Sequence, residues 1–360
     1  MEEKKAVGTR GAFSAVLRGV ERFRPQVLAA AGILILAGFG ASTAYSDDAA
    51  PPDVPASVLK GKKVAYVACS DLNRWCREFR KAVVGALEAK GVIVTDLQDP
   101  YDPVLQAQHL DQAIAQKPDL IALLPTNARS VVPSLHRAKA AGIPVVNLVG
   151  PMVPESQDYY VASIENNHQQ LGEDAATNII EGLKKEGLEK ANIMVITGAQ
   201  VQPEVGVRMD GFNSVIAKYP QYKVVEVQDG NWDQGKSGEI ARTIFAKYAD
   251  KGGIQAAFGM ADHMAAGIIQ AAQQAGIPVG IEKNGLIVTA SNCFAIGMVN
   301  IGNGLQYGTA TQAPEPTALF AIPLLEQVLA GQTIPKRSLY QESRITKDNL
   351  DKWKVFCGSA

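Results

Sequence analysis

The stretch DLIALLPTNARSVVPSLHRAKAAGIPVVNLVG, from Asp119 to Gly150, decides the fold class. LIALL is an apolar run too short for a helix, whereas Val131 to Ala141 carries apolar residues at helical spacing before Gly142 ends the pattern. IPVVNLV then reads as a second strand, rich in β-branched residues. Parallel strands joined by a helix are covered on both faces, so they read as continuous apolar runs. We predict an α/β chain whose functional loops lie at the carboxyl ends of its strands.

The same unit recurs along the chain. KKVAYVAC (Lys62–Cys69) is a first strand that leads into a helix from about Trp75 to Lys90, and VIVTDL is the next strand. The pattern restarts after YYVASIENN (Tyr159–Asn167). Two successive halves predict two similar lobes, with a ligand held between them. We assign residues 61–166 and 313–340 to the N-terminal lobe and residues 167–312 and 341–360 to the C-terminal lobe, joined by a multi-strand hinge.

The N-terminal segment has the composition of an export signal. Six basic residues precede an apolar run from Val27 to Ala44, after which residues 47–60 form an acidic and Pro-rich linker. Basic region, apolar run and small residues in this order indicate a secretory signal peptide within residues 1–46. An uncleaved membrane anchor is the alternative, because the run is near the lower limit for spanning a bilayer. Either alternative predicts that the rest of the chain is periplasmic.

Composition excludes several functions. The 360 residues include 35 Lys and Arg and 36 Asp and Glu, which gives a formal net charge of −1 and no long-range attraction for nucleic acid. Motifs of serine hydrolases, zinc proteases and phosphate-binding loops are absent from the sequence. We therefore predict that the chain is not an enzyme and carries no cofactor. A metal site is disfavoured because the four histidines are scattered and no C-x-x-C occurs.

The four cysteines are Cys69, Cys76, Cys293 and Cys357. An even number in an oxidising compartment permits disulfides, and four cysteines allow three connectivities. Cys69 and Cys76 are the closest in sequence, but spacing does not select among the pairings. Free buried thiols that act as small apolar side chains remain the alternative.

Five motifs, in order, resemble one family. They are the segment from Lys62 to Gly91, the AGIPVV strand, R-x-x-G-F at Arg208–Phe212, M-x-D-x-M-A-x-G-x-x-x-A at Met260–Ala271, and T-x-T-Q-x-P at Thr309–Pro314. Together they resemble periplasmic sugar-binding proteins of the ribose/galactose branch, which have the type I solute-binding fold. The resemblance implies a monomeric capture protein of an ABC importer, whose lobes close on a small ligand and whose closed form docks on a membrane permease.

By position, the resemblance also implies which residues contact the ligand. Trp75 and Trp232 would face a flat sugar ring from two sides, and the Arg208 guanidinium would donate to paired oxygens. Either tryptophan could instead belong to the core, Arg208 could form a surface ion pair, and Gln312 could have a purely structural role in the hinge. The full predicted set is Cys69, Asp71, Asn73, Trp75, Cys76, Gly150, Arg208, Trp232, Asp233, Ala261, Ser291, Asn292 and Gln312.

Several positions depart from the family pattern. Val149 and Gly150 replace a usual Asp-Arg pair, Ala261 replaces an asparagine and Ser291 replaces an aspartate. Each loss removes a partner for a sugar hydroxyl, at about 1–3 kcal/mol, which argues against ribose and common aldopyranoses. Two ligand types remain open. One is an acid whose carboxylate neutralises Arg208. The other is a polyol or modified sugar with fewer hydroxyl groups.

Five polar residues near the predicted cleft carry capping or turn interpretations. Asp71 and Asp233 could supply acids to the site or act as turn residues and helix caps. Asp262 is predicted as a helix N-cap, and the pair Thr126-Asn127 as turn residues. For the whole chain, a sensing module that docks on a chemoreceptor or sensor kinase is the alternative to transport.

Overall fold

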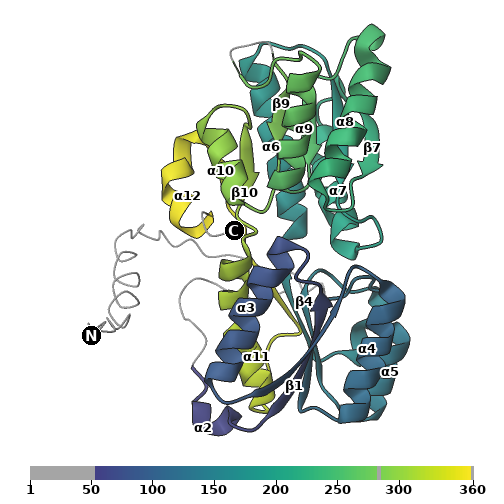
Figure 1. The fold of residues 1–360 in the computed structure, drawn as a ribbon, viewed down its shortest axis with the longest axis vertical. Coiled ribbons are helices and arrows are strands. Elements are labelled where there is room, and N and C mark those ends of the chain that lie inside the picture. The colour runs from purple at the N-terminus through teal and green to yellow at the C-terminus, as the bar shows by residue number, and fades with distance from the viewer. Residues whose placement is uncertain (1–52, 282–284, 358–360) are drawn as a thin grey trace, which may run out of the picture. The chain divides into compact units, whose positions relative to one another are not determined.

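The computed structural model describes residues 53–281 and 285–357. The predicted signal peptide or anchor and residues 47–52 of the predicted linker lie outside the described residues. Within the part of the chain that is described, no helix combines the length and apolarity needed to cross a bilayer. The same part forms two six-stranded sheets, each flanked by helices (Figure 1). The predicted α/β class is confirmed.

The first sheet has the strand order β11-β5-β4-β3-β1-β2, and all of its pairings are parallel. The stretch that opens the sequence analysis supplies its centre, since every residue of β3 and β4 is buried. In chain order this half contains α2 (Ala56–Leu59), β1 (Lys63–Cys69), α3 (Arg74–Ala89), β2 (Ile93–Asp99), α4 (Pro103–Gln116), β3 (Leu120–Leu123), α5 (Val132–Ala140), β4 (Val145–Val149), the 3-10 helix η1 (Pro154–Tyr159) and β5 (Ala162–Asn166), with β11 (Arg337–Tyr340) arriving late.

The second sheet has the order β12-β10-β9-β8-β6-β7 and is parallel except for β12, which runs antiparallel to β10. This edge strand is short, and it closes the sheet beside the last helix. The elements are α6 (His168–Lys185), β6 (Ala191–Thr197), α7 (Pro203–Ile216), β7 (Tyr222–Asp229), α8 (Gln234–Tyr248), η2 (Ala249–Lys251), β8 (Ala256–Gly259), α9 (Asp262–Gln274), β9 (Ile287–Thr289), α10 (Ala295–Gly302), β10 (Gly308–Ala310), β12 (Arg344–Thr346), η3 (Lys347–Asn349) and α12 (Leu350–Cys357).

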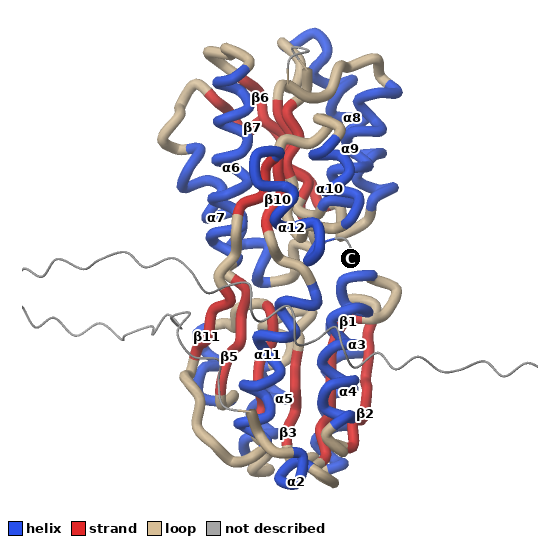
Figure 2. Tube along the Cα trace, turned by 90° about the vertical axis from the view of Figure 1, so that its left-hand side faces the viewer, coloured by secondary structure: helices blue, strands red, loops and turns tan. Residues whose placement is uncertain are grey.

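The chain passes between the two halves three times. It leaves the first sheet after β5, returns after β10 through α11 (Pro314–Leu329), and leaves again after β11 (Figure 2). Helix α11 packs against α3 of the first half. A multi-strand hinge is therefore present, and Gln312 lies on its middle segment.

Helix α10 was not predicted from the sequence, because the side chain that stabilises its first turn lies far away along the chain. Its sequence AIGMVNIG contains two glycines and no capping side chain of its own. The Asp262 carboxylate, at the start of α9, accepts a hydrogen bond from the backbone N–H of Phe294 at 2.9 Å. This bond satisfies one of the free N–H groups at the beginning of α10. Tertiary contact overrides weak local propensity here.

Two helices of the second half begin at residues that favour a helix start. Helix α7 starts at Pro203, since proline is tolerated in the first turn. Helix α8 starts at Gln234, because the Asp233 side chain accepts from the N–H of Lys236. Both starts bring polar side chains to the ends of strands of the second sheet.

Both pairs of cysteines form disulfides, Cys69–Cys76 and Cys293–Cys357. The alternative of free thiols is wrong. Cys293 follows β9 and Cys357 ends α12, so this bond attaches the last helix to the second half.

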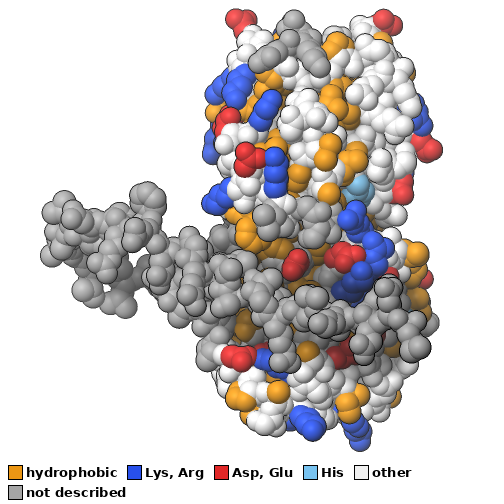
Figure 3. Space-filling view, turned by 60° about the vertical axis from the view of Figure 1, so that its left-hand side comes forward, with side chains coloured by type: hydrophobic (Ala, Val, Ile, Leu, Met, Phe, Trp, Pro, Cys, Tyr) orange, Lys and Arg blue, Asp and Glu red, His pale blue; other side chains and the backbone are white. Residues whose placement is uncertain are grey.

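The surface carries charges of both signs. Basic and acidic side chains both appear on the face shown in Figure 3, in line with the nearly balanced numbers of 35 basic and 36 acidic residues.

Candidate ligand-binding cleft

A cavity of about 50 Å³, open at its mouth, lies between the ends of the two sheets. Loops and helix starts of both halves contribute to its walls, and Gln312 of the hinge closes one side. The lining residues are Cys69, Asn73, Trp75, Cys76, Tyr101, Leu124, Val149, Gln202, Glu204, Arg208, Trp232, Ala261, His263, Asn292, Phe294 and Gln312.

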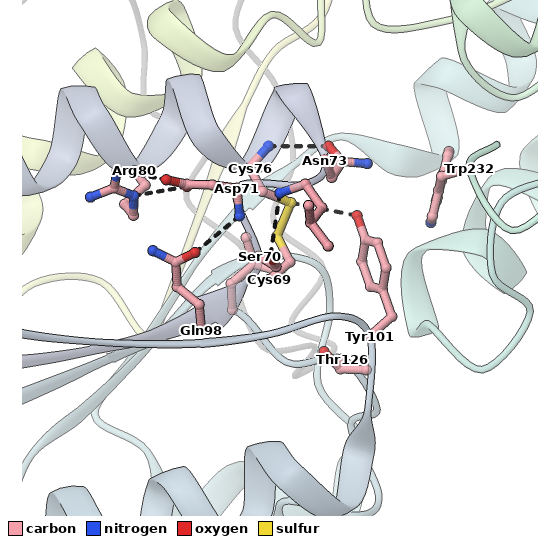
Figure 4. The surroundings of a disulfide bond; sticks show 12 residues. Cys69, Ser70, Asp71, Asn73, Cys76, Arg80, Gln98, Tyr101, Thr126 and Trp232 are labelled. Carbon is pink, nitrogen blue, oxygen red and sulfur yellow. Dashed lines mark hydrogen bonds and ion pairs between the residues drawn. A yellow bond between two sulfur atoms is a disulfide. The ribbon is translucent and has the colours of Figure 1, made fainter. Parts of the chain in front are cut away.

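One wall is the disulfide loop between β1 and α3. Cys69 ends β1 and Cys76 lies in the first turn of α3, so their bond closes the loop over the end of the sheet. The Asn73 side chain caps α3 by accepting from the N–H of Cys76 at 3.2 Å. The Tyr101 hydroxyl lies 3.5 Å from the Cys76 sulfur (Figure 4). These contacts present sulfur, amide and phenol groups to the cavity in a fixed arrangement.

Trp75 belongs to both the core and the cavity wall. Its ring stacks on Phe79 with centroids 4.9 Å apart, and its Nε1–H donates to the carbonyl oxygen of Gln312 at 3.0 Å. Only 7% of the residue is exposed. The indole thus connects the first half of the molecule to the hinge, and its remaining exposed surface lines the cavity.

Trp232 faces the disulfide loop from the second half of the chain (Figure 4). Its backbone is left-handed, with φ of 55°, and its Nε1–H donates to the Gln202 side chain. A Cβ atom on Gly198 would lie 2.0 Å from the indole, so only glycine lets the ring occupy this place. The Arg208 guanidinium lies 5.4 Å from the ring centroid, within cation–π distance.

Arg208 is 1% exposed, so the alternative of a surface ion pair is wrong. Its Nε donates to His168 Nδ1 at 3.2 Å, one terminal nitrogen donates to the Met260 carbonyl at 3.0 Å, and the other donates to the Gln312 side chain. Each nitrogen of the guanidinium therefore has a protein acceptor. The arginine connects α7 to the start of α6, to the end of β8 and to the hinge.

His168 extends this network to the first half. Its Nδ1 accepts from Arg208, so Nε2 carries the proton and donates to the Val149 carbonyl oxygen at 2.8 Å. Burial and the nearby Arg208 charge hold the pKa of His168 well below its usual value. The imidazole is neutral at physiological pH and acts as a fixed link between the two halves.

Two buried acids compensate the Arg208 charge, and the sequence analysis missed both. Glu204 lies one turn before Arg208 on α7 and lines the cavity, whereas Glu342 is held at the hinge by Asn166 and Thr311. Burial raises the pKa of each carboxyl to about 7, and the Arg208 charge opposes the shift in both. The premise that Arg208 lacks a neutralising acid is therefore wrong. For Glu204, the signal available in the sequence was the Pro203-Glu204 pair shortly before R-x-x-G-F.

Four predicted residues do not line the cavity. Asp71 points away from it and forms an ion pair with Arg80 at 2.7 Å (Figure 4), because that cation lies in the second turn of α3. Asp233 caps α8. Gly150 lies beside Glu204, where a Cβ would be 2.8 Å from the carboxylate oxygen, and Ser291 is fully buried behind the lining. The other nine predicted residues meet at the cavity, and their contact with a ligand stays a prediction.

The prediction that Asp262 is the N-cap of α9 is wrong, because Ala261 holds that position and Asp262 is the first residue of the helix. The Asp262 carboxylate is buried and accepts from Phe294 and from the Gln306 side chain at 2.7 Å. Asn127 does act as a turn residue, since its side chain accepts from the N–H groups of Arg129 and Ser130. Thr126 is buried and donates to Asp99 at 2.8 Å.

Left-handed backbone is concentrated around the cavity. Among described residues other than glycine, positive φ occurs at Tyr101, Lys117, Val149, Asn231, Trp232, Asn292 and Cys293. All but Lys117 follow the carboxyl ends of strands that face the cavity. Val149, with φ of 72°, is a β-branched residue in a region that such residues rarely adopt. Strain of this kind gathers at ligand sites, where the surrounding structure holds it in place.

Replacing Cys69 and Cys76 together by serine tests the disulfide wall. Loss of a cross-link across a sequence separation of 7 is expected to lower the free energy of unfolding by about 2 kcal/mol and to weaken ligand binding, because the loop no longer holds the cavity wall. Denaturation and ligand titration measure the two effects. The matched double serine variant of Cys293 and Cys357, which lie outside the cavity wall, should be destabilised yet keep its ligand affinity. Equal affinity in both double variants would contradict a role for the wall.

The model of the periplasmic binding protein domain family matches residues 64–333, most of the chain. This chain belongs to the periplasmic binding protein domain family. Membership implies a periplasmic or extracellular location, and the family consists of binding proteins rather than enzymes.

Curated relatives bear the names of carbohydrate-binding proteins. The chain is 26% identical over 265 residues to a D-apiose import binding protein of Paraburkholderia graminis, covering 70% of this chain and 76% of that one. It is 27% identical over 291 residues to a xylitol-binding protein of Mycolicibacterium smegmatis, covering 79% and 77%.

Solved structures share the fold. A galactofuranose binding protein superposes with a TM-score of 0.74 at 18% identity, over 82% of this chain and 99% of the other. A fructose-binding periplasmic domain of a hybrid two-component system superposes with a TM-score of 0.72 at 21% identity, over 82% and 93%. At these identities the likeness shows the fold alone, which is the type I periplasmic-binding fold. The alternative of a sensing module is not favoured by the relatives, whose names describe import and binding.

Proposed function

We propose that the chain captures a small polyhydroxylated ligand, an uncommon sugar or a polyol, for an ABC importer. The observation that carries this proposal is the cavity itself. One tryptophan from each half, Trp75 and Trp232, and the Arg208–Gln312 pair at the hinge all line the same space. Aromatic faces pack against the C–H surface of a sugar, and buried polar groups fix its hydroxyls.

The network around Arg208 supports capture by lobe closure. His168, Arg208 and Gln312 connect the second half to Val149 and to the hinge, and Asn127 donates across the mouth to the Val201 carbonyl oxygen at 3.3 Å. Contacts that form only when the halves approach each other favour the closed state. A ligand held between the same walls stabilises that state by its differential affinity.

The relatives support the ligand class. The names of two of them specify apiose and xylitol, a branched pentose and a pentitol, rather than a common hexose. The missing partners at Val149, Gly150, Ala261 and Ser291 agree with a ligand that has fewer hydroxyls than a hexopyranose.

A thermal-shift screen of the purified protein tests the function. The panel contains aldoses, ketoses and polyols, each beside its sugar acid and its amino-deoxy counterpart. A binder at about 100 times its dissociation constant should stabilise the folded protein by about 2.7 kcal/mol. Absence of a shift with every member of the panel would overturn the proposal.

Trp232→Ala is expected to abolish the shift produced by the panel's binder while changing the unliganded melting temperature little. The indole is only partly buried, so its loss removes ligand contact more than core packing. Calorimetric titration measures the affinity. Trp353→Ala is the matched control, because Trp353 on α12 is also partly buried and lies outside the cavity wall. An unchanged affinity in Trp232→Ala would remove this tryptophan from the site.

A further inference from the structure

Two charged side chains that line the cavity, Arg208 and Glu204, differ in the number of hydrogen bonds that they form within the protein. Each nitrogen of Arg208 already donates to an acceptor of the protein. Glu204 is in the opposite situation. Its carboxylate accepts from its own backbone N–H, and no other described side chain donates to it. Among the described ion pairs none joins Glu204 to Arg208, although the two residues lie one turn apart on α7.

Glu204 is also buried where a ligand would reach it. The residue is 6% exposed and lines the cavity, so a ligand in the cavity would lie beside it in a site largely shielded from bulk solvent. Gly150 makes room for it, since any side chain there would place a Cβ 2.8 Å from Glu204 Oε2. Burying a carboxylate away from water without hydrogen-bond donors costs free energy. A bound ligand that donates hydrogen bonds to the carboxylate would offset that cost.

We propose that Glu204 is the specificity-determining acceptor of the cleft, and that the ligand is therefore a neutral or cationic donor, a polyol, sugar or amino sugar, and not a sugar acid. This inference rests on the proposed function. Within the described lining Glu204 is the only carboxylate, and Arg208 is compensated by Glu204 and Glu342. A ligand carboxylate would thus meet a like charge at Glu204 and no guanidinium nitrogen without a partner. Hydroxyl or ammonium groups would supply the missing hydrogen bonds.

Binding should release a proton from Glu204. Burial raises its pKa to about 7, and hydrogen bonds to the ionised carboxylate lower that value. Among the other titratable groups of the cavity wall, burial raises the pKa of Tyr101 and lowers that of His263, and Arg208, whose pKa is lowered to about 10, stays charged. Behind the wall, burial also raises the pKa of Glu342, which faces Arg208, to about 7, so the pH dependence assigned to Glu204 is the part that Glu204→Gln removes. His168 behind Arg208 stays neutral because burial lowers its pKa. The affinity for a neutral ligand should accordingly rise with pH up to the Glu204 pKa.

The experiment compares xylitol with D-xylonate and 1-amino-1-deoxyxylitol, together with the acid and amino counterparts of any other neutral binder from the panel. We expect the neutral and amino members to bind and each acid to bind at least tenfold more weakly. Between pH 8 and pH 5.5 the affinity of a neutral binder should fall by up to about 30-fold. Glu204→Gln should weaken that binder by about 10- to 100-fold and remove the pH dependence.

Glu165→Gln is the matched control, because it makes the same change at a buried acid that lies outside the cavity wall and does not act on Arg208. It should keep the preference for neutral ligands over acids. An acid that binds as tightly as its neutral counterpart would overturn the inference about Glu204. So would a neutral binder whose affinity changes neither with pH nor in Glu204→Gln. Either result would leave the proposed capture function standing. The comparison of acids with neutral ligands uses the unaltered protein, so it decides the question even if Glu204→Gln does not fold. Failure of every probe would instead overturn the proposed function.

Discussion

Arg208→Ala is expected to lower the free energy of unfolding of the unliganded protein by about 3 to 5 kcal/mol. The substitution removes a fully buried cation that compensates Glu204 and Glu342 and donates to the Met260 carbonyl and the Gln312 side chain. Two acids and two acceptors would lose their partner at once. Urea and thermal denaturation followed by circular dichroism measure the loss.

Two further variants separate charge from geometry. Arg208→Lys keeps a cation near the two acids but has no planar fork, so its stability should lie between those of the parent and the alanine variant. Arg242→Ala, on the exposed face of α8, should change the unfolding free energy by less than about 0.5 kcal/mol. Parental stability in Arg208→Ala would contradict the network described for the hinge.

Gly172→Ala is expected to cost about 3 kcal/mol and to abolish ligand binding. A Cβ atom at this position on α6 would lie 1.9 Å from the Arg208 carbonyl oxygen and 2.7 Å from the Phe212 backbone nitrogen. Backbone atoms cannot rotate away, so α6 and α7 must separate. Because Arg208 and Glu204 both belong to α7, the separation would also move them out of register with the cavity. Denaturation and ligand titration measure the two losses.

Gly206→Ala provides the matched control on α7. No atom lies within 4 Å of a Cβ at Gly206, so the same change there should leave ligand affinity unaltered and stabilise the helix by up to about 1 kcal/mol. If Gly172→Ala were as stable as Gly206→Ala, the close approach of α6 and α7 would not be a requirement of the fold.

The residues of the cavity wall were partly predicted from the sequence. The family resemblance implied Cys69, Trp75 and Asn292 by position, and all three follow or flank apolar runs, in line with the rule that ligands meet the carboxyl ends of parallel strands. Glu204 and Glu342 were missed for a different reason. Glu342 follows β11, a strand near the end of the chain that pairs with β5 of the first sheet. No local sequence pattern predicts this pairing.

The sequence by itself determined the class of fold, the two-lobed arrangement and the region of the cleft, because apolar periodicity and strand length act over a few residues. Only the tertiary structure decided which charges are satisfied. From the sequence, Arg208 favoured an acidic ligand. In the structure its three nitrogens donate hydrogen bonds to His168, Met260 and Gln312. A buried charge is stabilised by partners that can lie far away along the chain, and their number depends on packing rather than on sequence spacing.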